Sequence, residues 1–527
     1  MSVDQIVKDG KSSPTEIPAR VHVSRGHILK SVLSNWSYLI VNAIVAFVMT
    51  PFVVRHLGDS AYGIWALVLQ LTGYMGIVDV GLRSALVRFV SSAHAKKDQE
   101  GLNRLISSTI MIYGLMAPLS LVVGVLLALL ALPRLHIAAA NLHSAQITLL
   151  LAALIIACDF LFATFHASLA GLSRWDMINA LGISSVLVRT TLIVVFIEHG
   201  YGLITLALIQ LCVNVASYLI EAAMVRHLIP QLKFIWHRPD KEQMRPVLQH
   251  SWYSFLLSFA NRINYQVDSI VIAAFLPIGE VTYYVIGLRL IEYLRDLLNS
   301  TTMVASPLVS SLDAVGESGQ VVATLIRGTK YSLIVGFLGV AGFLALGTDF
   351  IHIWMGLRFA AKSGGVLMIL SLGLLFSGTQ FASGHVLYGL GKHRINLNWT
   401  IVESILNLAL SITLVRRYGI LGVAAGTTIA NFLIRGWLYP RAVLSALGVS
   451  WTEYLKDGIF PAIPPAIAFF VTVFFFKKVF PIQGYLQLIG AVVVGLLPFV
   501  ACLWLTGLDR GERGLIRNRL KQAVASS

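Results

Sequence analysis

Apolar runs of about twenty residues recur along almost the whole chain, and this feature limits the fold more than any other. A run of that length is what one helix needs to cross the hydrocarbon core of a bilayer. The sequence therefore predicts an all-α polytopic membrane protein with about fourteen spanning helices. The expected spans lie near residues 32–54, 60–82, 105–131, 145–170, 178–197, 201–224, 248–275, 282–305, 331–352, 364–389, 397–415, 419–440, 459–476 and 485–506.

Composition agrees with lipid as the main solvent. Hydrophobic residues make up 57% of the 527 residues and charged residues 12%, whereas soluble domains carry roughly 25% charged residues. The first thirty residues contain no apolar core of a cleavable signal peptide. The three cysteines, Cys158, Cys212 and Cys502, lie inside apolar runs, so they indicate neither a disulfide framework nor a metal site. No cofactor is expected.

The formal net charge of +15 could indicate a nucleic-acid partner, but the distribution of Lys and Arg argues against one. Most of these residues fall in segments on one side of the predicted spans, including the stretches 83–104, 226–245 and 510–521. Positive loops face the cytoplasm. We therefore expect both termini in the cytoplasm and no nucleic-acid partner.

An internal repeat divides the spans into two similar units. The segment Phe162-Ala-Thr-Phe-His166 recurs as Phe381-Ala-Ser-Gly-His385, and Asn214 corresponds to Asn431. An even number of spans per unit gives parallel copies. We expect a cytoplasmic tail (1–31), an N-lobe of six spans (32–225), a linker (226–247), a C-lobe of six spans (248–443), two added spans (459–506) and a cytoplasmic tail (507–527).

Enzymatic signatures are missing from the sequence. It contains no phosphate-binding Gly-x-x-x-x-Gly-Lys-Ser/Thr loop, no His-Glu-x-x-His pair and no Gly-x-Ser-x-Gly elbow. The predicted connections are also too short for a folded domain outside the membrane, which typically needs about 50 residues or more. The chain is therefore predicted to be a carrier and not an enzyme.

Polar stripes at helical spacing run through several spans and predict a hydrated central cavity. The seventh span has Ser251, Ser254, Ser258, Asn261, Tyr265 and Asp268 at steps of three and four; the eighth has Arg289, Glu292, Asp296 and Asn299. Ionisable groups in hydrocarbon are costly and usually face a bundle interior or wet cavity. The competing interpretation is that the stripes join helices through hydrogen bonds. The residues predicted to line the cavity are Arg189, Asn261, Arg262, Tyr265, Asp268, Arg289, Glu403, Asn407 and Arg435.

Acidic residues inside the spans are candidates for coupling to an ion. Asp159, Asp268 and Glu403 lie well within the predicted helices. Asp159 and Arg189 are close to mid-membrane on neighbouring spans, so they could instead neutralise each other. His166 and His385 occupy a repeated position, where a structural role in hydrogen bonding is the simpler interpretation. The stripes predict a polar path but do not reveal the charge of the cargo.

Several motifs resemble a known family. Pro51-Phe-Val-Val-Arg-His-Leu-Gly58 leads into Tyr62-Gly-Ile-Trp-Ala-Leu67, and Asp79-Val-Gly-Leu-Arg-Ser-Ala-Leu-Val-Arg88 follows; Val267-Asp-Ser-Ile-Val-Ile-Ala-Ala-Phe-Leu276 with Val281-Thr-Tyr-Tyr284 looks like the second-half counterpart. Over about residues 30–440 the chain resembles Wzx-type polysaccharide and O-antigen flippases of the multidrug/oligosaccharidyl-lipid/polysaccharide (MOP) exporter superfamily.

The resemblance implies two six-helix lobes around a cavity that opens alternately to each side. It implies a location in the bacterial cytoplasmic (inner) membrane and a cargo of oligosaccharide units linked to undecaprenyl diphosphate. It also implies coupling to protons or sodium, and work alongside a polysaccharide polymerase and other assembly proteins. Arginines would suit the diphosphate. The alternatives are a small-molecule or drug exporter of the related multidrug (MATE) branch and an integral-membrane polymerase or ligase. The first span lacks the acidic residue of the drug-exporter branch and the Arg-Asp pattern of the lipid II branch. Pro461, Pro464 and Pro465 are expected to kink the thirteenth span, shaping a groove for the lipid tail or only adjusting helix packing.

Overall fold

The computed structural model describes residues 25–76, 79–96, 98–231 and 241–526, and these ranges are helical almost throughout, with no strand among them. Helices suit a chain in lipid because they satisfy their own backbone hydrogen bonds. The α-helices are α1 (Arg25–Met75), α2 (Asp79–Lys96), α3 (Gln99–Leu126), α4 (Ala139–Gly171), α5 (Trp175–Glu198), α6 (Leu203–Leu228), α7 (Lys241–Phe275), α8 (Gly279–Thr302), α9 (Ala305–Ala314), α10 (Ser318–Met355), α11 (Leu357–Ser377), α12 (Thr379–Gly389), α13 (His393–Ala430), α14 (Tyr439–Leu447), α15 (Trp451–Glu453), α16 (Ile463–Val479), α17 (Tyr485–Cys502) and α18 (Arg510–Ser526).

Ten helical stretches among the described residues are long and apolar enough to cross a membrane. Two of them are long enough for two crossings: Leu33–Met75 turns at Gly58 and His393–Leu447 turns at Gly419. Both glycines have a positive φ, 80° and 58°, which residues with a side chain rarely adopt. The helices α7 and α8 have suitable lengths but carry the polar stripes. The protein is an all-α polytopic membrane protein, and its helices are compatible with fourteen crossings.

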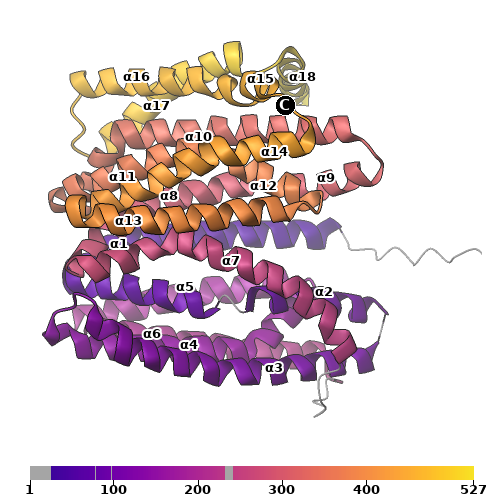
Figure 1. Cartoon of the computed structure of the whole chain (residues 1–527), viewed down its shortest axis with the longest axis vertical. Helices are drawn as coiled ribbons and strands as arrows, with labels where there is room; N and C mark the ends of the chain where they lie inside the picture. The colour runs from indigo at the N-terminus through magenta and orange to yellow at the C-terminus, as the bar shows by residue number, and fades with distance from the viewer. Residues whose placement is uncertain (1–24, 77–78, 97, 232–240, 527) are drawn as a thin grey trace, which may run out of the picture.

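The helices form two bundles and an outer pair (Figure 1). In the N-terminal bundle, α4 packs against α3 and α6, and α1 against α5; in the C-terminal bundle, α7 packs against α13, and α11 against α8 and α10. The bundles meet where α1 contacts α8 and where α2 contacts α7. The pair α16–α17 lies on the outer side of the C-terminal bundle, where α16 packs against α10.

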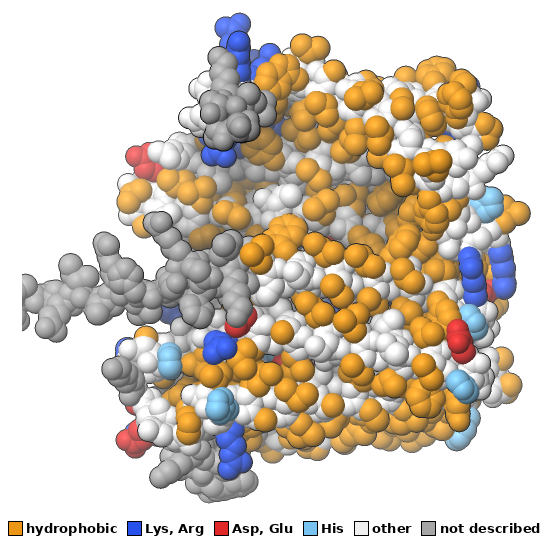
Figure 2. Space-filling model, turned by 180° about the vertical axis from the view of Figure 1, so that it is seen from behind, with side chains coloured by type: hydrophobic (Ala, Val, Ile, Leu, Met, Phe, Trp, Pro, Cys, Tyr) orange, Lys and Arg blue, Asp and Glu red, His pale blue; other side chains and the backbone are white. Residues whose placement is uncertain are grey.

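The two ends of the molecule differ. Gly58 and Gly419, together with the connections 135–138, 199–202, 276–278 and 480–484, lie at one end, which we call the hairpin end. The helix α1 begins, and α18 lies, at the opposite end, which we call the terminal end. Hydrophobic side chains cover the middle of the face shown in Figure 2, while charged side chains gather mainly toward the two ends. This distribution is typical of a lipid-facing belt.

Helix boundaries refine the expected spans. The helix α1 begins at Arg25, and α2 reaches Lys96, beyond the predicted end of the second span at residue 82, so the basic stretch that starts at Arg83 is helical through Lys96. The helix geometry of the thirteenth span changes near its prolines. A π-helical turn (Tyr454–Ile459) and a 3-10 turn (Phe460–Ala462) precede α16, and Pro461 lies in the second of them. The stretch Trp451–Val479 nevertheless remains one helical run.

Candidate functional site

A polar cavity of about 640 Å³ lies inside the C-terminal bundle. Ligand-binding pockets typically have volumes of about 300–1,000 Å³. Residues of α8 form one wall, in the half of the helix nearer the terminal end, and α7, α12, α13 and the π-helical segment η5 (Asn431–Leu438) complete it. The lining residues are Asn261, Gln266, Arg289, Glu292, Arg295, Asp296, Asn299, Gln380, Phe381, Gly384, His385, Tyr388, Asn396 and Arg435.

The lining carries both signs of charge. Arg289 and Glu292 form an ion pair with an Nη1–Oε2 distance of 2.8 Å, and they belong to the stripe that the sequence predicts on α8. The ring of His385 lies 3.2 Å from the amide oxygen of Asn299. The lining holds three arginines and two carboxylates, and a third carboxylate, Glu403, pairs with Arg435 from behind the lining. Paired charges, amides and two aromatic rings together suit a polyhydroxylated ligand, which needs many directional hydrogen bonds.

Arg435 is held at the edge of the cavity by a buried ion pair. Its side chain is 1% exposed and that of Glu403 is 0% exposed, and Arg435 Nε lies 2.5 Å from Glu403 Oε2. Two further nitrogens donate to Thr400 Oγ1 (2.8 Å) and to Asn396 Oδ1 (3.2 Å). The helix α13 supplies all three of these partners. A buried arginine with this many fixed partners is well positioned but largely neutralised.

A second buried network surrounds Asp268, apart from the cavity lining. Its carboxylate accepts hydrogen bonds from Tyr284 (2.5 Å), Thr427 (2.9 Å) and Ser411 (3.4 Å). Asn407 joins the same network, because its Oδ1 accepts from Ser411 and Thr427, both at 3.1 Å. All of these side chains are buried among α7, α8 and α13. Asp268 has hydroxyl donors around it, and no ion pair with it is present in the described part of the chain.

The predicted site residues therefore divide into groups. Asn261, Arg289 and Arg435 line the cavity, and Glu403 lies behind Arg435. Asp268 and Asn407 belong to the second network. Arg262 donates to Gln266 at 2.5 Å, and its carbonyl oxygen accepts from Tyr74 of α1 at 3.1 Å, so it lies where the two bundles meet. The side chain of Tyr265 is outside the part that the structure describes.

The prediction that Asp159 and Arg189 neutralise each other is wrong. Arg189 donates instead to Gln210 of α6 at 2.8 Å. Asp159 pairs with Arg83 of α2 at 2.9 Å, and the same guanidinium lies 2.6 Å from Asp79. The physical reason is that α2 extends beyond the predicted span and brings Arg83 beside α4. The sequence gives no sign of this because Arg83 falls in a stretch that looks like a basic loop.

An apolar groove of about 730 Å³ runs beside the polar cavity. The helices α12 and η5 form the wall between the two: Thr379 and Gly436 border the groove, whereas their neighbours Gln380 and Arg435 border the cavity. The opposite side of the groove comes from α10 and α16, with Phe337, Leu344, Ile463 and Phe470 among its residues.

The two bundles are joined at the hairpin end by a set of contacts that we call the hairpin-end lock. Asp59 of the N-terminal bundle forms an ion pair with Arg358 and accepts a hydrogen bond from Tyr283 (2.8 Å). Its backbone carbonyl accepts from Thr282 (2.6 Å). A Cβ atom on Gly63 would lie 2.3 Å from the carbonyl oxygen of Ile278, so only glycine allows this approach. The described conformation is thus closed between the bundles at this end.

Comparison with known proteins gives the family. The model of the family described as "Polysaccharide biosynthesis protein" matches residues 28–313, more than half of the chain. The chain belongs to this family. The polysaccharide biosynthesis family motifs at Pro51–Gly58 and Asp79–Arg88 both lie inside the matched region, which confirms the resemblance drawn from them.

Individual relatives of this polysaccharide biosynthesis family member are distant but cover most of its length. A protein of Shigella flexneri whose name assigns it the role of O-antigen transporter is 22% identical, over 79% of this chain and 98% of its own. A Bacillus subtilis (strain 168) protein named uncharacterized membrane protein EpsK is 20% identical, over 93% and 97%. The structure titled lipid II flippase MurJ, inward closed conformation, has a TM-score of 0.69 at 18% identity, covering 90% and 98%, and it shows a shared fold.

Several cavity residues have no counterpart among the predicted site residues. Gln380 and Tyr388 lie on the tenth span, for which no polar stripe is predicted, and Gln266 and Asn396 are not among the residues predicted to line the cavity. The one available signal was the repeated segment that ends at His385, which does line the cavity. Its counterpart His166 contacts the Glu221 carboxylate at 3.0 Å, so the repeat conserves the position of the ring but not its partner.

Proposed function

We propose that this chain is a flippase that moves oligosaccharide units linked to undecaprenyl diphosphate across the bacterial cytoplasmic membrane, for O-antigen, surface polysaccharide or exopolysaccharide assembly. Membership of the polysaccharide biosynthesis family and the O-antigen role named for the Shigella relative support this assignment. The observation that carries it is the polar cavity inside an apolar bundle, with an apolar groove on the other side of one helical wall.

The two chemistries of the cargo match these two spaces. Sugars and a diphosphate lose water when they cross a bilayer, so they need hydrogen bonds and positive charge from the protein. Arg289, Arg295 and Arg435 bring guanidinium groups to the cavity, the first and last of them paired with carboxylates, and the amides and carboxylates around them bind hydroxyl groups. The isoprenoid needs only apolar contact, which the groove between α10 and α16 offers. We assign the saccharide to the cavity and the lipid chain to the groove.

Alternating access between the bundles moves the cargo in this proposal. The hairpin-end lock holds the bundles together at one end, and the polar cavity lies toward the other end, so cargo enters from the terminal end. The excess of Lys and Arg in the segments at the terminal end supports a cytoplasmic location for it and for both termini. Release then requires the lock to open toward the outer side.

Carrier function is preferred to a polymerase or ligase activity. The helix connections at the hairpin end are short in the described ranges; the stretch 480–484 is among the longest of them. An external catalytic domain does not fit on connections of this length. Polymerisation of the flipped units therefore falls to a separate protein, and a polysaccharide polymerase is a natural partner.

Asp268 is the best of the candidate residues for coupling to a proton or a sodium ion. Asp159 and Glu403 are both paired with arginines, whereas the side chains that donate hydrogen bonds to the Asp268 carboxylate are neutral hydroxyl groups that can reorient when its charge is neutralised. Asp268→Asn keeps the size of the side chain and removes its charge. We expect export to fall by roughly 5–150-fold, the range of a typical coupling free energy, while the amount of protein in the membrane stays unchanged. Export equal to wild type would remove Asp268 from the coupling mechanism.

The function itself is tested in a deletion strain. Without the gene, the lipid-linked repeat unit should accumulate on the cytoplasmic leaflet, and polymer should be missing from the cell surface. In sealed membrane vesicles, an oxidant of sugars that cannot cross the membrane reacts only with repeat units on the exposed leaflet, so it distinguishes the two leaflets. Normal surface polymer in a strain without a redundant transporter would contradict the proposal, and a change in drug resistance with unchanged polymer would favour an exporter of small molecules.

A further inference from the structure

A lysine is buried at the terminal end of α10, and its partners come from the last helix of the chain. The side chain of Lys330 is 3% exposed. Its Nζ lies 2.7 and 2.8 Å from the two carboxylate oxygens of Glu512, and 3.4 Å from Asp509. The neighbouring Tyr331 hydroxyl donates to Glu512 at 2.5 Å. A buried ammonium group without a partner is strongly unfavourable, so α10 depends on α18 to neutralise this charge.

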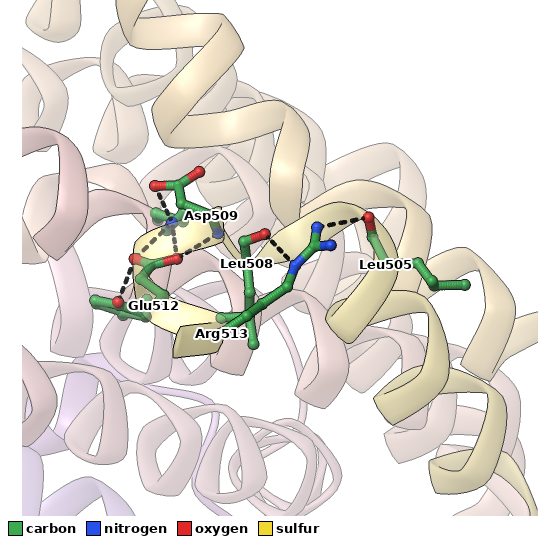
Figure 3. Close-up of polar contacts among 7 residues, drawn as sticks. Leu505, Leu508, Asp509, Glu512 and Arg513 are labelled. Carbon is green, nitrogen blue, oxygen red and sulfur yellow. Dashed lines mark hydrogen bonds and ion pairs between the residues drawn. The ribbon is translucent and has the colours of Figure 1, made fainter. Parts of the chain in front are cut away.

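Glu512 also fixes the start of α18. Its Oε2 accepts from the backbone amide of Asp509 at 2.8 Å, which is the reciprocal half of a capping box. Arg513, one residue later, reaches back and donates to the carbonyl oxygens of Leu505 and Leu508, both at 2.9 Å (Figure 3). These carbonyls lie at the end of the fourteenth span. The first turn of α18 thus ties α17 to α10 through neighbouring charged residues.

The hydrogen bonds to Glu512 together affect its pKa more than its burial does. Burial alone would raise the pKa of this carboxyl group, but the donors Lys330, Tyr331 and the Asp509 amide together hold its pKa below the ordinary value. A carboxyl group with a lowered pKa in the folded state stabilises the fold above its unfolded-state pKa. That contribution is lost as the pH falls through the folded-state value.

A second lysine–carboxylate pair joins the outer helices to α10 at the hairpin end. Lys477 of α16 forms an ion pair with Asp349 of α10 and also donates to the carbonyl oxygen of Ala345 at 3.4 Å. Residues 330 and 349 are separated by nineteen steps on one helix, or roughly 28 Å, close to the thickness of a hydrocarbon core. The apolar groove lies along α10 between these two pairs.

We propose that the first turn of α18 is a latch: Glu512, by neutralising Lys330, fixes the α16–α17 pair to α10 at the terminal end, so that the apolar groove keeps a constant width while the two bundles move. The Lys477–Asp349 pair fixes the opposite end. The role of the groove in transport rests on the proposed function. The attachment of α18 to α10 does not, and it can be measured without transport.

The test compares Glu512→Gln, Lys330→Met and the double variant in the full-length protein. Glu100→Gln is the matched control, because Glu100 pairs with Arg104 at 2.8 Å on an exposed face of α3. We expect Glu512→Gln to lower the melting temperature of the purified protein by roughly 3 °C or more. The double variant should recover this loss, since no buried charge remains, and Glu100→Gln should change nothing. An unchanged melting temperature for Glu512→Gln would overturn the latch.

A distance measurement and an export assay separate the two parts of the proposal. Spin labels on α10 and on the exposed side of α18 should give a narrow distance distribution in wild type and a broad one in Glu512→Gln and in the double variant. If the latch maintains the groove, the double variant should be stable and still export poorly. If the double variant is stable, has a broad distance distribution and still exports as well as wild type, the latch does not serve transport by keeping the groove at a constant width. Failure of wild type to flip lipid-linked sugars would overturn the proposed function and leave the stability and distance results standing.

Discussion

Glu403→Gln is expected to destabilise the protein by about 3–5 kcal/mol, the usual effect of removing one partner of a buried ion pair. Glu403 is fully buried and contacts Arg435 at 2.5 Å. After the substitution the guanidinium keeps Thr400 and Asn396 as hydrogen-bond acceptors but has lost its neutralising charge. Thermal unfolding of the purified protein in detergent, followed by a fluorescence-monitored size assay, measures the loss.

The double variant Glu403→Leu/Arg435→Met separates the structural role of the pair from its role in transport. Replacing both charges with apolar groups of similar size usually restores stability, so this variant should unfold close to the wild-type temperature. Arg435 also lines the cavity, and without its guanidinium group the double variant should export little polymer. A double variant that is stable and exports normally would show that Arg435 only supports the helix packing. The exposed Arg104→Met substitution is the control for loss of an arginine.

The sequence predicted the cavity on α8 better than anywhere else. Arg289, Glu292, Asp296 and Asn299 all face the same space, because a spacing of three and four places side chains on one face of a helix and because apolar neighbours force that face inward. The fold class was equally accessible, since the length and number of apolar runs leave few alternatives in lipid. Periodicity therefore identifies which face of a helix is polar.

Periodicity does not identify what that face contacts. Asn261 and Asp268 belong to one predicted stripe on α7, yet the first lines the cavity and the second is buried among hydroxyl groups of α8 and α13. A helix of 35 residues passes several neighbours, and the partners of Asp268 come both from the next helix in the chain and from one more than a hundred residues away. The Arg83–Asp159 pair shows the same difficulty, because the helical extension of α2 is needed before the two residues can meet.

A disulfide between Asp59→Cys and Gly279→Cys is expected to stop export completely under oxidising conditions. A Cβ atom at Gly279 would lie 3.6 Å from the Cβ of Asp59, within the range of about 3.5–4.5 Å that disulfides require. Gly279 begins α8, whereas Asp59 follows the Gly58 turn, so the bond joins the two bundles at the hairpin-end lock. Export should return after reduction, because alternating access needs this end to open. The three native cysteines are replaced beforehand.

The control must show that it is the position of the crosslink that matters. Each single cysteine variant should export under both oxidising and reducing conditions. The Asp59→Cys variant also measures how much export is lost when Asp59 no longer pairs with Arg358. Gly328→Cys/Ala382→Cys places a crosslink within the C-terminal bundle; a Cβ atom at Gly328 lies 3.3 Å from that of Ala382, so α10 and α12 must move apart slightly for the bond to form. It should leave export intact when oxidised. Continued export by the fully crosslinked Asp59→Cys/Gly279→Cys protein would mean that the bundles need not separate at the hairpin end, and that cargo leaves by another route.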